Sequence, residues 1–135
     1  MSQFINFKTL KLKKTKNQYL SLPENSIFVS SPDILSPTFI CTIEEIKTIF
    51  EEFILTQPRI SSKFFDDQLN KFKCIQKTKY FKFPDLIDIE FIKIKDDVSS
   101  IAIYSRSIYG YYDFNVNKNR VKLWLDFLCK KLPTG

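Results

Sequence analysis

The stretch TIEEIKTIFEEFILTQP, residues 42–58, predicts an amphipathic helix. Thr42 and Glu45 have the spacing of a capping box, in which each side chain accepts a hydrogen bond from the other residue's backbone. Pro58 disfavours helical geometry in the residue before it, so we expect the helix to end at Gln57. Apolar residues recur at intervals of three and four and form one buried stripe: Ile46, Ile49, Phe50, Phe53 and Ile54.

After this helix the apolar pattern changes to a period of two, which predicts strands. Residues 71–80 place lysines on one side and mainly apolar side chains on the other. A break follows at Pro84-Asp85, and alternation resumes over residues 87–91. A turn at 95–97 then leads to residues 98–107, which are apolar on both faces and predict an interior strand.

The two ends of the chain complete the expected fold. We predict a last helix over residues 117–132, a short first strand at 38–41, and mostly irregular structure over residues 1–37. The order β-α-β-β-β-β-α predicts an α+β domain, with an antiparallel sheet of about five strands and two helices on one face. This order is similar to half of a TATA-binding-protein-like fold, or to a reduced helix-grip fold.

The net charge of +6 is concentrated near the N-terminus. Five lysines precede the first acidic residue, Glu24, while charges nearly cancel in the rest of the chain. We therefore assign residues 1–24 to a basic arm, residues 25–132 to the α+β domain and residues 133–135 to a tail. Such an arm is usually a solvated tail, and the alternative is attraction to polyanions or anionic lipid.

Several classes of site and location are disfavoured by the composition. The absence of histidine excludes the common zinc sites and Ser-His-Asp or Cys-His catalysis, so we expect no metal and no cofactor. Three widely spaced cysteines in apolar surroundings, at positions 41, 74 and 129, predict buried free thiols in a reducing compartment. We see neither a signal peptide nor a membrane span, and expect a cytoplasmic location, with the plastid as the alternative.

The densest polar sequence is YSRSIYGYYDFNVNKNR, residues 104–120, where the predicted interior strand ends and the last helix begins. Asp113, Asn115 and Asn117 are residue types that favour turns and helix caps. Arg106 and Arg120 are two of three arginines in a chain that otherwise uses lysine. An arginine kept against such a bias indicates a need for a planar, forked donor.

This segment resembles the family catalogued as domain of unknown function 1499, which occurs in bacteria and in plastid-bearing eukaryotes. The likeness covers roughly residues 25–132 and implies no particular activity. Two departures are Ile108, where many members have a second arginine, and Asn115, where they usually have glycine. The likeness rests on Ser105-Arg106-Ser107, on Gly110-Tyr111 with Asp113, on Val116-Asn117 with Arg120, on Phe83-Pro84-Asp85 with Asp88, and more weakly on Asn25 and Val29-Ser30-Ser31.

Two interpretations of this segment stay open. In the first, guanidinium groups and amides at the start of the last helix bind a carboxylate or phosphate. The residues of this candidate ligand site are Ser105, Arg106, Asp113, Asn117 and Arg120. In the second, the two arginines pair with Asp113, Asp85 or Asp88 and join the sheet to the helix.

Asp85 and Asp88 are secondary candidates, as a carboxylate pair for acid–base chemistry or a hard metal ion. Three residues apart on an extended segment, however, they project to opposite faces. We therefore expect a non-enzymatic accessory or small-ligand-binding domain whose partner is a small anion or a protein. The alternative is a protein that associates with nucleic acid or a membrane surface through its basic arm. We do not favour nucleic acid, because the lysine face of residues 71–82 is typical of a solvated strand.

Overall fold

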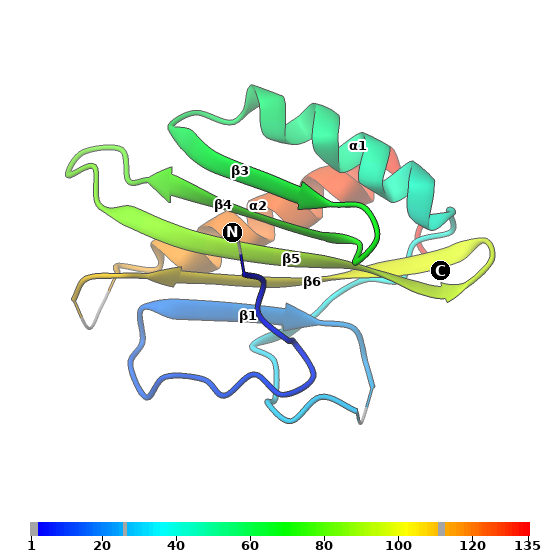
Figure 1. Cartoon of the computed structure of the whole chain (residues 1–135), viewed down its shortest axis with the longest axis horizontal. Helices are drawn as coiled ribbons and strands as arrows, with labels where there is room; N and C mark the ends of the chain where they lie inside the picture. The colour runs from blue at the N-terminus through cyan, green and yellow to red at the C-terminus, as the bar shows by residue number, and fades with distance from the viewer. Residues whose placement is uncertain (1–2, 26, 111–112) are drawn as a thin grey trace.

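A six-stranded sheet with two helices forms the computed structural model, which describes residues 3–25, 27–110 and 113–135 (Figure 1). The spatial order of the strands is β2-β1-β6-β5-β4-β3. Neighbouring strands are antiparallel except β1 and β2, which are parallel. The elements are β1 (Gln18–Leu22), β2 (Ile34–Leu35), α1 (Ile43–Thr56), β3 (Ile60–Asp66), β4 (Lys71–Lys77), β5 (Pro84–Lys95), β6 (Val98–Ser107) and α2 (Val116–Lys131).

The capping box predicted for the first helix is present. Glu45 N donates to Thr42 Oγ1, and Thr42 N donates to Glu45 Oε1, each over 3.1 Å. The helix ends at Gln57, as expected from the proline that follows. Its buried stripe packs on the sheet, where the Phe50 ring lies 5.3 Å from Phe72 and 5.8 Å from Trp124 of α2. Both helices therefore share one core with the same face of the sheet.

The other face of the sheet is covered by the N-terminal residues. Figure 1 shows this segment crossing in front of the sheet, while α2 passes behind it. Phe7 is only 2% exposed and packs with Leu20, Ala102 and Tyr104. Partly buried Ile5, Leu10 and Leu12 add to this second cluster. We call the two sides of the sheet the helix face and the N-terminal face.

The predicted α+β class and element order are confirmed, with six strands in place of about five. The second short strand before α1 accounts for the difference. Among the described residues, no helix combines the length and the apolar character that a membrane span requires.

Two local predictions were wrong, and a third was incomplete. The described part of residues 1–37 is mostly irregular, as expected, but it also contains β1 and β2. β1 lies within the 24 residues assigned to a basic arm and pairs with β6. The predicted strand at 38–41 is reduced to isolated bridges of Phe39 with Ser99 and with Thr134. The expected break at Pro84-Asp85 is instead the start of β5, a position where a strand tolerates proline.

Candidate functional site

The sheet separates the two arginines that the sequence singled out. Ser105 Oγ accepts a hydrogen bond from Arg120, so Ser105 points to the helix face. Arg106 is the next residue of the same strand and therefore points to the N-terminal face. The expectation that both guanidinium groups gather where the last helix begins is thus wrong for Arg106. The reason is the two-residue period of β6.

Arg120 lies at the centre of a buried network on the helix face. Its Nη2 donates to Asp85 Oδ2 at 2.8 Å, and its Nη1 donates to Ser105 Oγ at 3.0 Å and Asn117 Oδ1 at 2.8 Å. Its Nε donates to Gln76 Oε1. The Arg120 side chain is 6% exposed and that of Asp85 is 1% exposed. We call these five residues the Arg120 network; they join β4, β5 and β6 to α2.

Asn117 extends the Arg120 network to the start of α2. Its amide nitrogen donates to Ser107 Oγ, to Asp113 Oδ2 and to the carbonyl of Asn17, which precedes β1. Asp113 also caps the helix, because its carboxylate accepts the backbone N–H groups of Asn115 and Asn117, each over 3.0 Å. Asn115 adopts the left-handed conformation, with φ of 64°, which asparagine tolerates better than most residues.

The Arg120 network is therefore a structural clasp. Its donors and acceptors serve one another in a site closed to solvent, which is how a buried charge becomes tolerable. Asp85 Oδ1 is the one buried side-chain atom of this network without a partner in the described structure. The sequence analysis missed Gln76, a member of the network, and Asn17, which accepts a hydrogen bond from Asn117, because both are far from α2 in the sequence.

Arg106 forms its own ion pair on the N-terminal face. Its Nη1 donates to Asp88 Oδ2 at 2.7 Å and to the Tyr104 carbonyl at 3.3 Å, and the guanidinium stacks 4.7 Å from the Tyr104 ring centroid. Each arginine pairs with an aspartate, as in the second interpretation, but only the pair of Arg120 and Asp85 joins the sheet to the helix. The two ion pairs also confirm that Asp85 and Asp88 project to opposite faces. Neither Nε nor Nη2 of Arg106 has a hydrogen-bond partner among the described residues.

A cavity of about 220 Å³ lies beside this pair. Its walls are largely apolar, with Ile5, Phe64, Ile75 and Leu86 around the polar side chains of Lys73, Asp88 and Arg106. Lys73 of β4 lies opposite Asp88 of β5 in the sheet register, and its ammonium donates to the Gln3 carbonyl at 2.7 Å. The N-terminal residues thus form one wall. We call this cavity the Arg106 pocket.

Lys13 adds to the positive charge near Arg106. Its ammonium donates to the Ser107 carbonyl at 3.0 Å. Burial and the charge of Arg106 lower the pKa of Lys13, and Asp85 partly offsets this effect. Lys13 therefore adds a cationic side chain at this end of β6, although it does not line the Arg106 pocket.

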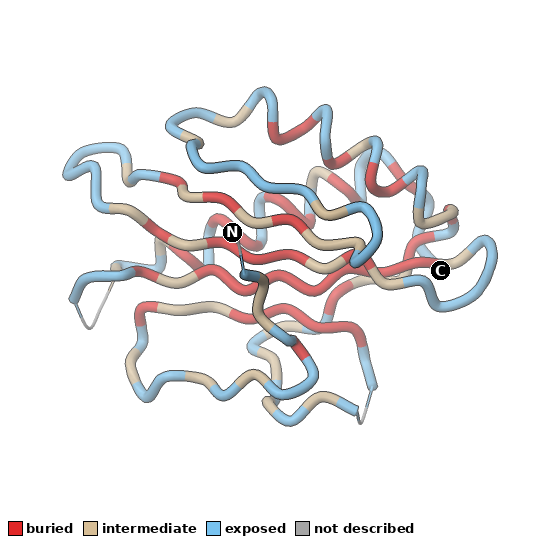
Figure 2. Tube along the Cα trace, in the orientation of Figure 1, coloured by how far each residue is buried: buried red, intermediate tan, exposed pale blue. Residues whose placement is uncertain are grey.

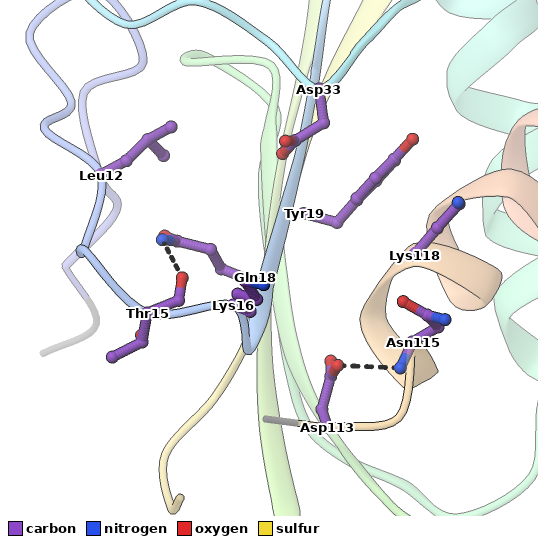
Figure 3. Close-up of a pocket in the computed structure, with 9 residues that line it drawn as sticks. All are labelled: Leu12, Thr15, Lys16, Gln18, Tyr19, Asp33, Asp113, Asn115 and Lys118. Carbon is purple, nitrogen blue, oxygen red and sulfur yellow. Dashed lines mark hydrogen bonds between the residues drawn. The ribbon is translucent and has the colours of Figure 1, made fainter. Parts of the chain in front are cut away.

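A second cavity, of about 270 Å³, lies between residues 12–19 and the start of α2 (Figure 3). Its charged side chains are Lys16, Lys118, Asp33 and Asp113. Both carboxylates already accept backbone N–H groups, that of Asp33 from Leu20 at 2.8 Å. Equal numbers of carboxylates and ammonium groups give this cavity no clear preference for an anion. Of the residues proposed as a ligand site, only Asp113 lines it.

The cysteines give no reactive centre in the described structure. Burial raises the pKa of Cys74 to about 12 and also raises that of Cys41, so both thiols stay protonated at neutral pH. Cys129 is exposed on α2, which corrects the prediction that all three are buried. Its helical position lies one residue past the buried Leu128, outside the apolar stripe. No group of three potential metal ligands occurs among the described residues.

Comparison with known proteins gives one match. No curated protein and no solved structure matches the chain. The family model described as "Protein of unknown function (DUF1499)" matches residues 13–128, which is well over half of the chain and includes every strand and the whole Arg120 network. The chain therefore belongs to the DUF1499 family.

Proposed function

We propose that this domain binds a small organic anion in the Arg106 pocket, with a carboxylate on the free edge of Arg106 and a short apolar body against the walls. The observation that carries the proposal is the guanidinium whose Nε and Nη2 donors have no described partner, placed in a cavity with apolar walls. A guanidinium presents its donors as a planar fork that matches a carboxylate.

Charge and size support the same ligand class. Among the charged side chains that line the pocket, the two cations Lys73 and Arg106 outnumber the one carboxylate, Asp88, so an added negative charge is attracted. The volume of about 220 Å³ is below the range of roughly 300–1,000 Å³ typical of drug-sized ligands. The ligand is therefore small. The Arg120 network does not compete for it, because Arg120 already holds Asp85.

The proposal is tested by titrating the protein with acetate, butyrate and hexanoate while following its amide NMR signals. We expect saturable shifts at residues 86–88 and 106. Affinity should rise with chain length, because each buried methylene contributes about 0.8 kcal/mol. Arg106→Lys keeps the charge but removes the fork, and should abolish the response at unchanged melting temperature. Arg59→Lys, at an exposed arginine outside both cavities, is the matched control.

A second variant keeps the test informative if Arg106→Lys destabilises the fold. Phe64 is 47% exposed and lines the pocket, so Phe64→Ala should weaken hexanoate binding and leave acetate binding unchanged. An unchanged response in Arg106→Lys, or shifts confined to the cavity at Lys118, would contradict the proposal.

A further inference from the structure

Aromatic side chains are exposed together at one end of the sheet. The connection between β4 and β5 carries Tyr80, Phe81 and Phe83, which are 80%, 75% and 50% exposed. Tyr109, in the connection from β6 to α2, is 62% exposed and contacts Phe83 edge-on at 6.3 Å. Figure 1 shows both connections at the same end of the sheet, and Figure 2 shows residues 79–83 and 108–110 in the colour of exposed residues. We call these four residues the aromatic tip.

The backbone holds the aromatic tip in this exposed arrangement. Thr78 N donates to the Phe83 carbonyl at 2.9 Å, and Phe83 N donates to Thr78 Oγ1 at 3.0 Å. Lys82 N closes the turn by donating to the Thr78 carbonyl, and Lys82 has a positive φ of 58°. The turn is therefore hydrogen-bonded across its base, and the exposed rings do not fold back onto the core. A cluster of exposed apolar side chains of this kind marks an interaction surface.

The charge around the aromatic tip is positive. Lys77, Lys79 and Lys82 are exposed within the same seven residues, KTKYFKF. Arg59 is added from the start of β3, because its Nε donates to the Lys77 carbonyl at 2.9 Å. No acidic residue occurs in the sequence between Asp67 and Asp85, and Asp85 is buried against Arg120.

We infer that the aromatic tip inserts into the surface of an anionic membrane. Aromatic rings favour the interface between lipid and water, and flanking lysines are attracted to anionic headgroups. A single-stranded nucleic acid would instead need open ring faces on which bases stack. Phe81 and Phe83 already stack on each other, at 5.5 Å with an interplanar angle of 16°. Lipid chains accept ring edges as readily as ring faces, so the arrangement favours a membrane.

Co-sedimentation of the full chain with vesicles tests this inference. We expect binding to vesicles of phosphatidylcholine with roughly 30% phosphatidylserine, little binding to phosphatidylcholine alone, and weaker binding as salt rises. Lys79→Glu with Lys82→Glu should abolish the preference for anionic lipid. Tyr80→Ser with Phe81→Ser should reduce the bound fraction about tenfold, since two exposed rings are lost while the charge is kept. All four side chains are exposed, so the fold should tolerate these changes.

Two controls separate this surface from other parts of the molecule. Lys11→Glu with Lys14→Glu makes the same charge change at exposed N-terminal residues. In this variant vesicle binding should still depend on Tyr80 and Phe81. Leu123→Ser removes an apolar side chain, 55% exposed, from the outer side of α2 and should have no effect. Arg106 does not belong to the aromatic tip, so Arg106→Lys should bind vesicles as the unchanged protein does. The membrane inference can therefore fail or succeed independently of the anion-binding proposal.

The inference is overturned if the aromatic variants bind vesicles as the unchanged protein does, or if the N-terminal variant alone abolishes binding. Binding to single-stranded oligonucleotides that displaces the vesicles, and that is lost in the aromatic variants, would also overturn it. That result would assign the rings to base stacking.

Discussion

Asp85 and Asp88 lie on the same strand, and each holds a different arginine on a different face of the sheet. Asp85 binds Arg120 of α2, and Asp88 binds Arg106 of β6. The first pair joins sheet to helix in a closed environment. The second lies beside a cavity that both Asp88 and Arg106 line. This division separates the ion pair that joins the sheet to α2 from the ion pair that lines a cavity.

Asp85→Ala should destabilise the protein by about 3–5 kcal/mol, because it leaves the buried Arg120 charge without its carboxylate. Urea unfolding followed by circular dichroism measures the change. Asp126→Ala is the control, since its pair with Lys130 is exposed and should cost less than about 0.5 kcal/mol. Equal effects of the two substitutions would show that the Arg120 network does not act as a clasp.

Phe7→Ala should destabilise the protein by about 3–5 kcal/mol, because Phe7 is buried against the N-terminal face. It should also make the first residues more accessible to proteases, which digestion followed by mass spectrometry detects. Lys11→Ala, at an exposed position of the same segment, should change neither measurement. A marginal effect of Phe7→Ala would instead support the solvated arm expected from the sequence.

Cys129 should be the cysteine that iodoacetamide modifies in the native protein, since Cys41 and Cys74 are buried. Burial and the nearby carboxylate of Asp126 raise the pKa of Cys129. Asp126→Asn removes the negative charge, lowers that pKa and increases the thiolate fraction at pH 8, so alkylation should become faster. Peptide mass spectrometry identifies the modified cysteine and follows the rate. Rapid native modification of Cys74 would contradict the described burial.

Stability should decrease above about pH 9 through the ionisation of Cys74. Burial raises the folded-state pKa of this thiol from 9.0 to about 12, so the unfolded chain loses its proton first as pH rises. The contribution is fully present below pH 9 and is lost as pH rises from 9 towards 12. Unfolding free energies measured across this window should decrease less steeply in Cys74→Ala. An identical slope in both proteins would exclude this origin.

Local sequence patterns were sufficient for the elements that carry regular periodicity. The capping box defined the start of α1, alternating apolar residues identified β4 and β5, and a run that is apolar on both faces identified β6. They were not sufficient for β3, whose seven residues are largely exposed and whose pairing with β4 shifts between Ser61 and Phe64. A strand without a buried face shows no alternation of apolar and polar residues. A bulge also shifts the two-residue period within the strand.

Only the part of the candidate site that depends on neighbouring residues was predicted from the sequence. Residue types at the start of α2 indicated the cap and the pairing of arginines with aspartates, which the structure contains. Sequence could not show that α2 packs on the face to which Ser105 points, and therefore that Arg106 faces the other way. It also could not bring Gln76 and Asn17 to this place, since their contacts depend on pairing between distant strands.

The pairing of β1 with β6 has a consequence for how the chain acquires its structure. Tyr19 lies opposite Ser105, so the strand that is synthesised first waits for a neighbour that is synthesised near the end. During translation β1 has only the two-residue β2 as a sheet neighbour until residues 103–106 have left the ribosome. Closing so long a loop loses conformational entropy before the contacts between the two strands form, and this slows folding. Nascent chains truncated before β6 should therefore remain protease-sensitive along their whole length.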